Sequence, residues 1–226
     1  MTYPHKPTPI PAIHPFKTVD SARTRLVHLS NERLRITIDH DPLVGITPAM
    51  LLYWFQHIGG AMEYAGATYP RYSVWHPIDH IHWGLAKPSP GGGAAEGASF
   101  HIVEAFGGDE NLLIDTIDRV EKLDETGIRL VKRVAGAKVF QLEHTWSAGR
   151  GRTHYVSVFD LGSPWRLLYP VNLYLRRRVF RPEMDQAWVK HNIEEVGLLE
   201  HILPSLMTQR DSRRDPFVGG GAVTGS

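Results

Sequence analysis

Apolar and polar residues alternate along much of the chain, and this pattern predicts β-strands. Between Arg33 and Asp39 every second residue is apolar, which is the period of a half-buried strand. Similar runs follow at 98–106, 112–123, 127–134, 138–146 and 153–161, with turn-forming residues between the last four. A further strand, interrupted by Pro77, is predicted over 72–85. Short turns between successive strands favour hairpins in one curved antiparallel sheet.

Two helices are predicted on either side of these strands. Thr47-Pro48 is a helix start, with threonine as the N-cap and proline at the first helical position. This helix is expected to end near Gly59-Gly60. A second, longer helix is predicted to open at Pro182-Glu183 and to end before Pro204, because proline disfavours a helix interior.

The order of these elements predicts an α+β, helix-grip fold, in which a curved antiparallel sheet surrounds a long C-terminal helix and encloses a cavity. Four segments are expected. They are a proline-rich extended arm (1–20), an N-terminal helical segment packed on the main domain (21–66), the helix-grip domain (67–210) and a flexible tail (211–226).

Composition narrows the classes of function. The net charge is +1, so nothing favours a nucleic-acid partner, and the arginines near 176–181 are interpreted as a solvated surface or the rim of an anionic-substrate site. With no cysteine, disulfides and thiolate metal sites are excluded. Neither a secretory signal nor a membrane-spanning stretch is found, so we expect no membrane partner and a cytoplasmic protein.

The C-terminal helix carries the first candidate for chemistry. At 100° per residue, His191 and Glu195 point to the same side as Trp188 and Leu199, and they lie one turn apart. A buried carboxylate is costly unless it is paired or binds a metal. Two interpretations stay open: a metal-binding pair, or a buried His–Glu hydrogen bond that holds the helix to the sheet.

Two further segments add candidate ligands. By strand alternation Glu104 shares an apolar face with Phe100 and Ile102, unless it pairs with an arginine or the other face is buried instead. The stretch 75–83 holds three histidines and Asp79 between two tryptophans, and one or two of these histidines are expected to reach a metal. Nitrogen and oxygen ligands without sulfur suit zinc, with manganese, iron or nickel as alternatives.

These residues also carry a resemblance. The Trp75-His76-Pro77-x-Asp79-His80 stretch, the Glu104 strand and the His191-x-x-x-Glu195 pair resemble the zinc-dependent carbon–carbon hydrolases typified by 2,4-diacetylphloroglucinol hydrolase and phloretin hydrolase. The resemblance covers about Thr47 to Leu203. It implies a helix-grip catalytic domain with Zn²⁺ held by His76, Glu104, His191 and Glu195, with His80 as the substitute for His76.

The resemblance further implies hydrolysis of the bond between an acyl group and a phenolic ring, with a phenolic ketone as substrate. Tyr69, Tyr72 and Tyr155 are the candidates that hold the ring hydroxyls, and Asp79, His80 or a tyrosine is the expected acid–base group. Two alternatives remain: a metal-free carrier of an aromatic or polyketide ligand, and a metalloenzyme of the same fold with other chemistry. The aromatic run 53–55 indicates either core packing or a homodimer surface.

Overall fold

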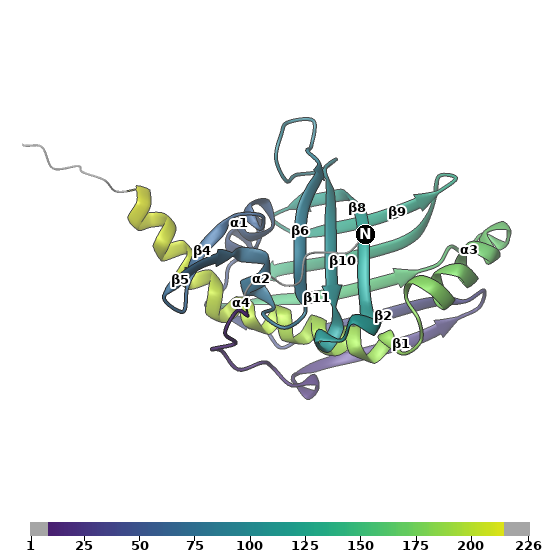
Figure 1. The fold of residues 1–226 in the computed structure, drawn as a ribbon, viewed down its shortest axis with the longest axis horizontal. Coiled ribbons are helices and arrows are strands. Elements are labelled where there is room, and N and C mark those ends of the chain that lie inside the picture. Colours follow the sequence, from purple (N-terminus) through teal and green to yellow (C-terminus); the bar gives the residue numbers. More distant parts are fainter. Residues whose placement is uncertain (1–8, 215–226) are drawn as a thin grey trace, which may run out of the picture.

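One antiparallel sheet of nine strands curves around the long helix α4 in the computed structural model, which describes residues 9–214 and the side chains of 9–210 (Figure 1). The strand order is β1-β2-β11-β10-β9-β8-β7-β6, and β3 pairs with β11. The sheet consists of β1 (Ala22–Leu29), β2 (Arg33–His40), β3 (Leu43–Val44), β6 (His80–Lys87), β7 (Ser99–Ala105), β8 (Leu113–Asp124), β9 (Gly127–Val134), β10 (Ala137–Ala148) and β11 (Arg152–Leu161). This is the helix-grip fold that the sequence predicts.

Helices and one small hairpin complete the structure. The α-helices are α1 (Pro48–His57), α2 (Arg71–Trp75), α3 (Tyr169–Tyr174) and α4 (Met184–Arg214), and the hairpin is β4 (Ala61–Tyr64) with β5 (Ala67–Pro70). A π-helix, Leu175–Val179, directly follows α3. Short 3-10 helices lie at Val19–Ser21, Phe106–Gly108, Glu110–Leu112 and Arg166–Leu168.

The predicted run of hairpins from β8 to β11 is confirmed. The β9–β10 turn has positive φ at Ala135 and Gly136, which is the two-residue turn geometry that matches the twist of the flanking strands. The α1 start is also confirmed, since the Thr47 hydroxyl accepts a hydrogen bond from the Met50 amide. Trp54 and Phe55 of α1 are buried in the core, so these aromatic residues pack inside the protein.

Residues 21–66 are not a separate helical segment. They form β1 and β2, which continue the large sheet beside β11, together with α1 and the β4–β5 hairpin. The predicted boundary at residue 66 was wrong because sheet pairing joins β2 to β11, more than 110 positions later in the chain, as at Arg35 and Asp160.

Two other predictions need correction. The 72–85 strand begins only at His80, because residues 71–75 form α2. Helix α4 continues through Pro204 to Arg214, four residues into the predicted tail, because Leu203 and Leu206 on either side of the proline are buried in the core. The rest of that tail, 215–226, lies outside the described residues.

The N-terminal arm explains why α4 is buried on more than one side. Lys17 packs over Gly197 and forms a 2.9 Å ion pair with Glu200, and Phe16 stacks on His76. Residues 9–18 thus run over the surface as expected, while 1–8 lie outside the described residues. Among the helices described, none has a stretch long and apolar enough to cross a membrane.

Candidate metal centre

Four buried or nearly buried side chains from three elements converge between the sheet and α4. His80 begins β6 and is paired in register with Glu104 on β7. His191 and Glu195 lie one turn apart on the face of α4 that meets these strands, as the helical periodicity predicts. The antiparallel pairing of β6 with β7 and the i, i+4 spacing on α4 therefore bring the four together.

The distances show an arrangement of two imidazole nitrogens facing two carboxylates. His80 Nε2 lies 3.5 Å from Glu104 Oε1 and 3.5 Å from Glu195 Oε2. His191 Nε2 lies 3.6 Å from Glu104 Oε2 and 3.8 Å from Glu195 Oε2. All four distances exceed hydrogen-bonding length, and His80 Nε2 is buried without a hydrogen-bond partner among the described residues.

Hydrogen bonds on the far side of both rings fix which nitrogen faces the cluster. His80 Nδ1 lies 2.8 Å from the carbonyl oxygen of Tyr72, and His191 Nδ1 lies 2.9 Å from Asp79 Oδ2. Both partners are acceptors, so each Nδ1 carries the proton, and in a neutral ring Nε2 presents its lone pair to the carboxylates. Histidine ligands of metals are held in this way by an acceptor on the second nitrogen.

The spacing fits a metal ion of the zinc type. Bonds of about 2.1 Å in a tetrahedral site separate neighbouring ligand atoms by about 3.4 Å, close to the observed distances between histidine nitrogens and carboxylate oxygens. Glu104 faces His80 with Oε1 and His191 with Oε2, and it is not among the residues whose single ligand atoms all lie within 4.8 Å of one another. The donor set of nitrogen and oxygen atoms is one that zinc and its neighbours accept. His80, His191 and Glu195 are each buried with their ligand atoms within 4.8 Å of one another.

The electrostatics of the cluster show that it needs a positive charge. Burial alone would lower the pKa of His191, but Glu104, Glu195 and Asp79 raise it to about 9. Burial lowers the pKa of His80 to about 4 and raises that of Glu195. Either a proton on His191 or a metal cation can therefore supply the charge that the facing carboxylates require.

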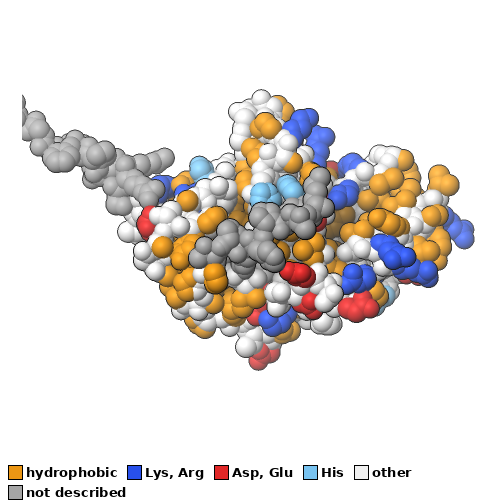
Figure 2. Space-filling model, in the orientation of Figure 1, with side chains coloured by type: hydrophobic (Ala, Val, Ile, Leu, Met, Phe, Trp, Pro, Cys, Tyr) orange, Lys and Arg blue, Asp and Glu red, His pale blue; other side chains and the backbone are white. Residues whose placement is uncertain are grey.

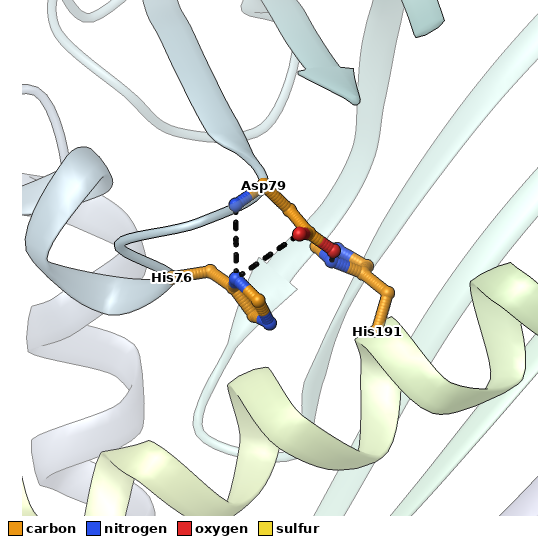
Figure 3. A group of neighbouring side chains, drawn as sticks. All are labelled: His76, Asp79 and His191. Atoms are coloured by element: carbon orange, nitrogen blue, oxygen red, sulfur yellow. Dashed lines mark hydrogen bonds and ion pairs between the residues drawn. The ribbon is translucent and has the colours of Figure 1, made fainter. Parts of the chain in front are cut away.

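His76 lies outside this group, so the structure brings His80 and not His76 against Glu104. The ring of His76 lies across Asp79 from His191 (Figure 3). His76 Nδ1 accepts a hydrogen bond from the Asp79 amide at 3.1 Å, and His76 Nε2 lies 3.4 Å from Glu194. Since its Nδ1 lone pair is used locally, His76 supports the 76–79 turn.

Asp79 has a supporting position. Burial opposes its charge, but the hydrogen bond with His191 and the nearby His76 lower the pKa of Asp79 to about 2. An ionised carboxylate behind His191 orients that ring and increases its basicity, which differs from the acid–base role expected from the sequence.

Two adjoining cavities meet at Glu104 and Trp188, which line both of them. One contains Tyr72, His191 and Glu195, and the Tyr72 hydroxyl donates a hydrogen bond to Glu104. The other is lined mostly by apolar side chains.

Tyr155 lines neither cavity, and its buried hydroxyl has no hydrogen-bond partner among the residues described. Tyr69 packs at the edge of the core against Tyr64.

The apolar cavity also holds a carboxyl group that the sequence analysis missed. Asp118 on β8 is buried, and burial raises its pKa to about 6 despite Lys132 at 3.5 Å. Alternation along β8 places Asp118 on the inner face with Val120, but 112–123 holds three acidic residues, and the sequence does not single out one of them.

A row of buried polar side chains behind Glu195 also left no sign in the sequence. Asn192 Nδ2 donates to Glu195 Oε1 at 2.6 Å, and the side chain of Asn192 lies close enough to His40 to oppose the lowering of its pKa by burial. Ser157 then lies 3.0 Å from His40 Nε2 and 2.9 Å from His144 Nδ1. His144 lines the same cavity as Glu195. These residues come from three strands and α4, so their proximity can be seen only in the folded structure.

Comparison with known proteins gives similar structures but no matching family model or curated protein. A START superfamily protein from Mycobacterium smegmatis is similar in structure, with a TM-score of 0.48 and 11% identity over 77% of this chain and 98% of that one. Protein Ms6760 from the same organism has a TM-score of 0.43 at 11% identity, covering 84% and 99%. Ara h 8.0201 has a TM-score of 0.40 at 10% identity, covering 74% and 97%.

Proposed function

We propose that this protein is a metal-dependent hydrolase that cleaves the bond between an acyl group and a phenolic ring, with zinc held by His80, Glu104, His191 and Glu195. One observation carries the metal part of the proposal. The Nε2 atoms of both histidines face both carboxylates at 3.5–3.8 Å, while each Nδ1 is held by an acceptor. The choice of reaction follows from the sequence resemblance.

The reaction converts an acylphenol and water into a carboxylic acid and a phenol. Water adds to the acyl carbon, the bond from that carbon to the ring breaks, and the ring carbon takes up a proton. When bound, zinc supplies a Lewis acid for a substrate oxygen and lowers the pKa of a water toward about 7.

The side chains around the cluster suit the other requirements of this reaction. Asp118, with its pKa near 6, is the candidate that delivers the proton to the ring carbon, since a general acid works best near the operating pH. Burial and the nearby Glu104 keep the pKa of Tyr72 well above its ordinary value, so its phenol stays protonated and holds the Glu104 carboxylate. Phe106 and Trp188 offer an apolar wall for an aromatic ring.

Elemental analysis of the purified protein is the first test. We expect about one zinc per chain in the wild type, lost in Glu104→Ala, Glu195→Ala and His80→Ala, because each variant removes a ligand. His76→Ala should keep its metal, and so should Glu143→Ala, which alters a surface ion pair with Arg129. Metal loading should then be followed by acid release from acylphloroglucinols. A loaded protein that releases no acid from any of them would refute the reaction but leave the metal site.

A metal-free carrier is the second candidate, and the protonation of His191 favours it. With a pKa of about 9, His191 is an imidazolium at neutral pH and can balance the buried carboxylates without a metal. In this case no zinc would be retained even after it is added back. Aromatic ligands would still bind in the cavities, and Trp188 in the wall provides a fluorescence signal for them.

A further inference from the structure

The segment between β11 and α4 exposes large apolar side chains at one end of the molecule. Leu167 is 88% exposed, Tyr174 61%, Trp165 56% and Tyr169 43%, and all four lie on residues 165–174. Single exposed apolar residues are ordinary on a protein surface, but four within ten positions are a feature that needs an explanation. Figure 2 shows hydrophobic side chains at this end, over α3, beside a group of Lys and Arg side chains.

The same segment is uniformly basic. Residues 165–179 contain four arginines and no aspartate, glutamate or lysine. Arg176 is buried in an ion pair with Asp185 at 2.9 Å, whereas Arg166, Arg177 and Arg178 are exposed. The groove next to the segment is lined by two glutamates, Glu32 and Glu183, and by four arginines, Arg33, Arg176, Arg177 and Arg181. Positive charge therefore continues from the segment into the groove beside it.

The segment is firmly attached, so its exposed residues are not the product of a frayed end. Leu168 and Leu175 are buried in a core cluster with Phe159 and Phe180. Asn172 is fully buried. Its Oδ1 accepts a hydrogen bond from the Ser163 amide at 2.8 Å, and its Nδ2 donates one to the carbonyl oxygen of Asn31 at 2.8 Å. The core-facing and surface-facing sides of the segment are thus clearly separated.

We propose that this segment docks the protein peripherally on an anionic lipid bilayer. Trp, Tyr and Leu side chains favour the headgroup boundary, and arginines beside them bind anionic lipids while their stems lie on apolar surface. Such binding needs no membrane-spanning helix, so it is compatible with the absence of one among the described helices. The proposal departs from the expectation of no membrane partner, which rested on the lack of a spanning stretch. A second copy of the chain fits less well, because a symmetric contact would bring the exposed arginines against each other.

The docking face is the outer side of a cavity wall. Leu175 and Val179 of the same segment line the apolar cavity that adjoins Glu104. A bilayer at this face would therefore lie one layer of side chains from the cavity, which gives apolar ligands a short route between the two. This inference stands on the exposed residues alone and does not depend on the proposed reaction.

Flotation of the full chain with lipid vesicles tests the proposal. We expect binding to vesicles of phosphatidylcholine with about one-third phosphatidylglycerol, and at least about tenfold weaker binding to phosphatidylcholine alone or in high salt. The double variant Arg177→Gln/Arg178→Gln should lose about tenfold on the anionic vesicles, and Trp165→Ala/Leu167→Asn should lose at least as much. These side chains are exposed, so the variants should melt like the wild type.

Matched controls lie on the sheet, away from the segment. Ile117 is 54% exposed on β8 and Arg119 is exposed on the same strand, so Ile117→Asn and Arg119→Gln should bind like the wild type. The proposal is overturned if the wild type ignores anionic vesicles, or if the control and segment variants lose binding equally. It is also overturned if the wild type is a dimer in solution that Trp165→Ala/Leu167→Asn converts to monomer.

Discussion

At the scale of residues, four side chains define the candidate metal centre, because His80 and His191 each face both Glu104 and Glu195. Helical spacing set His191 and Glu195 on the inner face of α4, and strand alternation set Glu104 on an inner face of β7. The fourth was ambiguous, because His76 and His80 lie four residues apart on either side of a proline. The formation of α2 and a turn before β6 turns His80 toward Glu104, and no local pattern in the sequence encodes that geometry.

The hydrogen bond from His191 to Asp79 leads to a prediction at this scale. Asp79→Asn keeps the shape of the side chain but removes its charge, so it weakens the orientation and basicity of His191. We expect metal affinity to fall by about 10- to 100-fold, as with other partners of metal-bound histidines. Competition with a chelator of known zinc affinity measures the change.

A conservative surface variant serves as the control for Asp79→Asn. Asp160→Asn alters an ion pair with Arg35 on the sheet and should leave zinc affinity unchanged. Equal affinity in Asp79→Asn and the wild type would show that Asp79 does not support a metal ligand.

At the scale of elements, the strands and hairpins from β7 to β11 followed from alternation and turn residues, since short-range rules govern both. The features that depend on contacts between distant residues could not be predicted from these local patterns. The pairing of β2 with β11 and the burial of α4 beneath residues 16–17 depend on contacts between distant parts of the chain. Pro204 shows the same limit, because the packing of Leu203 and Leu206 outweighs the local preference of proline to end a helix.

That conflict within α4 predicts a stabilising substitution. Proline in a helix interior lacks the amide that would bond the carbonyl of residue 200, and it costs about 3 kcal/mol relative to alanine. Some of this cost is offset because proline also restricts the unfolded chain. Pro204→Ala should therefore raise the free energy of unfolding by about 1–3 kcal/mol, measured by urea denaturation.

The neighbouring exposed residue gives the comparison for this helix. Ser205→Ala should change the free energy of unfolding by less than about 0.5 kcal/mol. If Pro204→Ala is instead less stable than the wild type, the packing of α4 requires a bend at the proline.

At the scale of the whole molecule, the buried histidines tie stability to pH. Burial, reinforced by His40, lowers the pKa of His144 to about 3, and burial lowers the pKa of His40 to about 4. In the unfolded chain both have pKa values near 6.5. Between those pKa values the unfolded state binds more protons than the folded state. The contribution of the two histidines to the free energy of unfolding is therefore complete above about pH 6.5 and is lost as the pH falls below it.

Replacing His144 should remove part of that pH dependence. Between pH 7 and pH 4.5 we expect His144→Gln to lose about 2 kcal/mol less stability than the wild type, because glutamine takes up no proton in either state. Urea denaturation at both pH values, with the same metal content in each sample, measures the difference. His154→Gln, at an exposed position on β11, is the matched control, and its free energy of unfolding should change between the two pH values as much as that of the wild type. If the stability of His144→Gln depends on pH as steeply as that of the wild type, folding does not hold His144 in its neutral form, and the buried group of His40, Ser157 and His144 would then carry a charge.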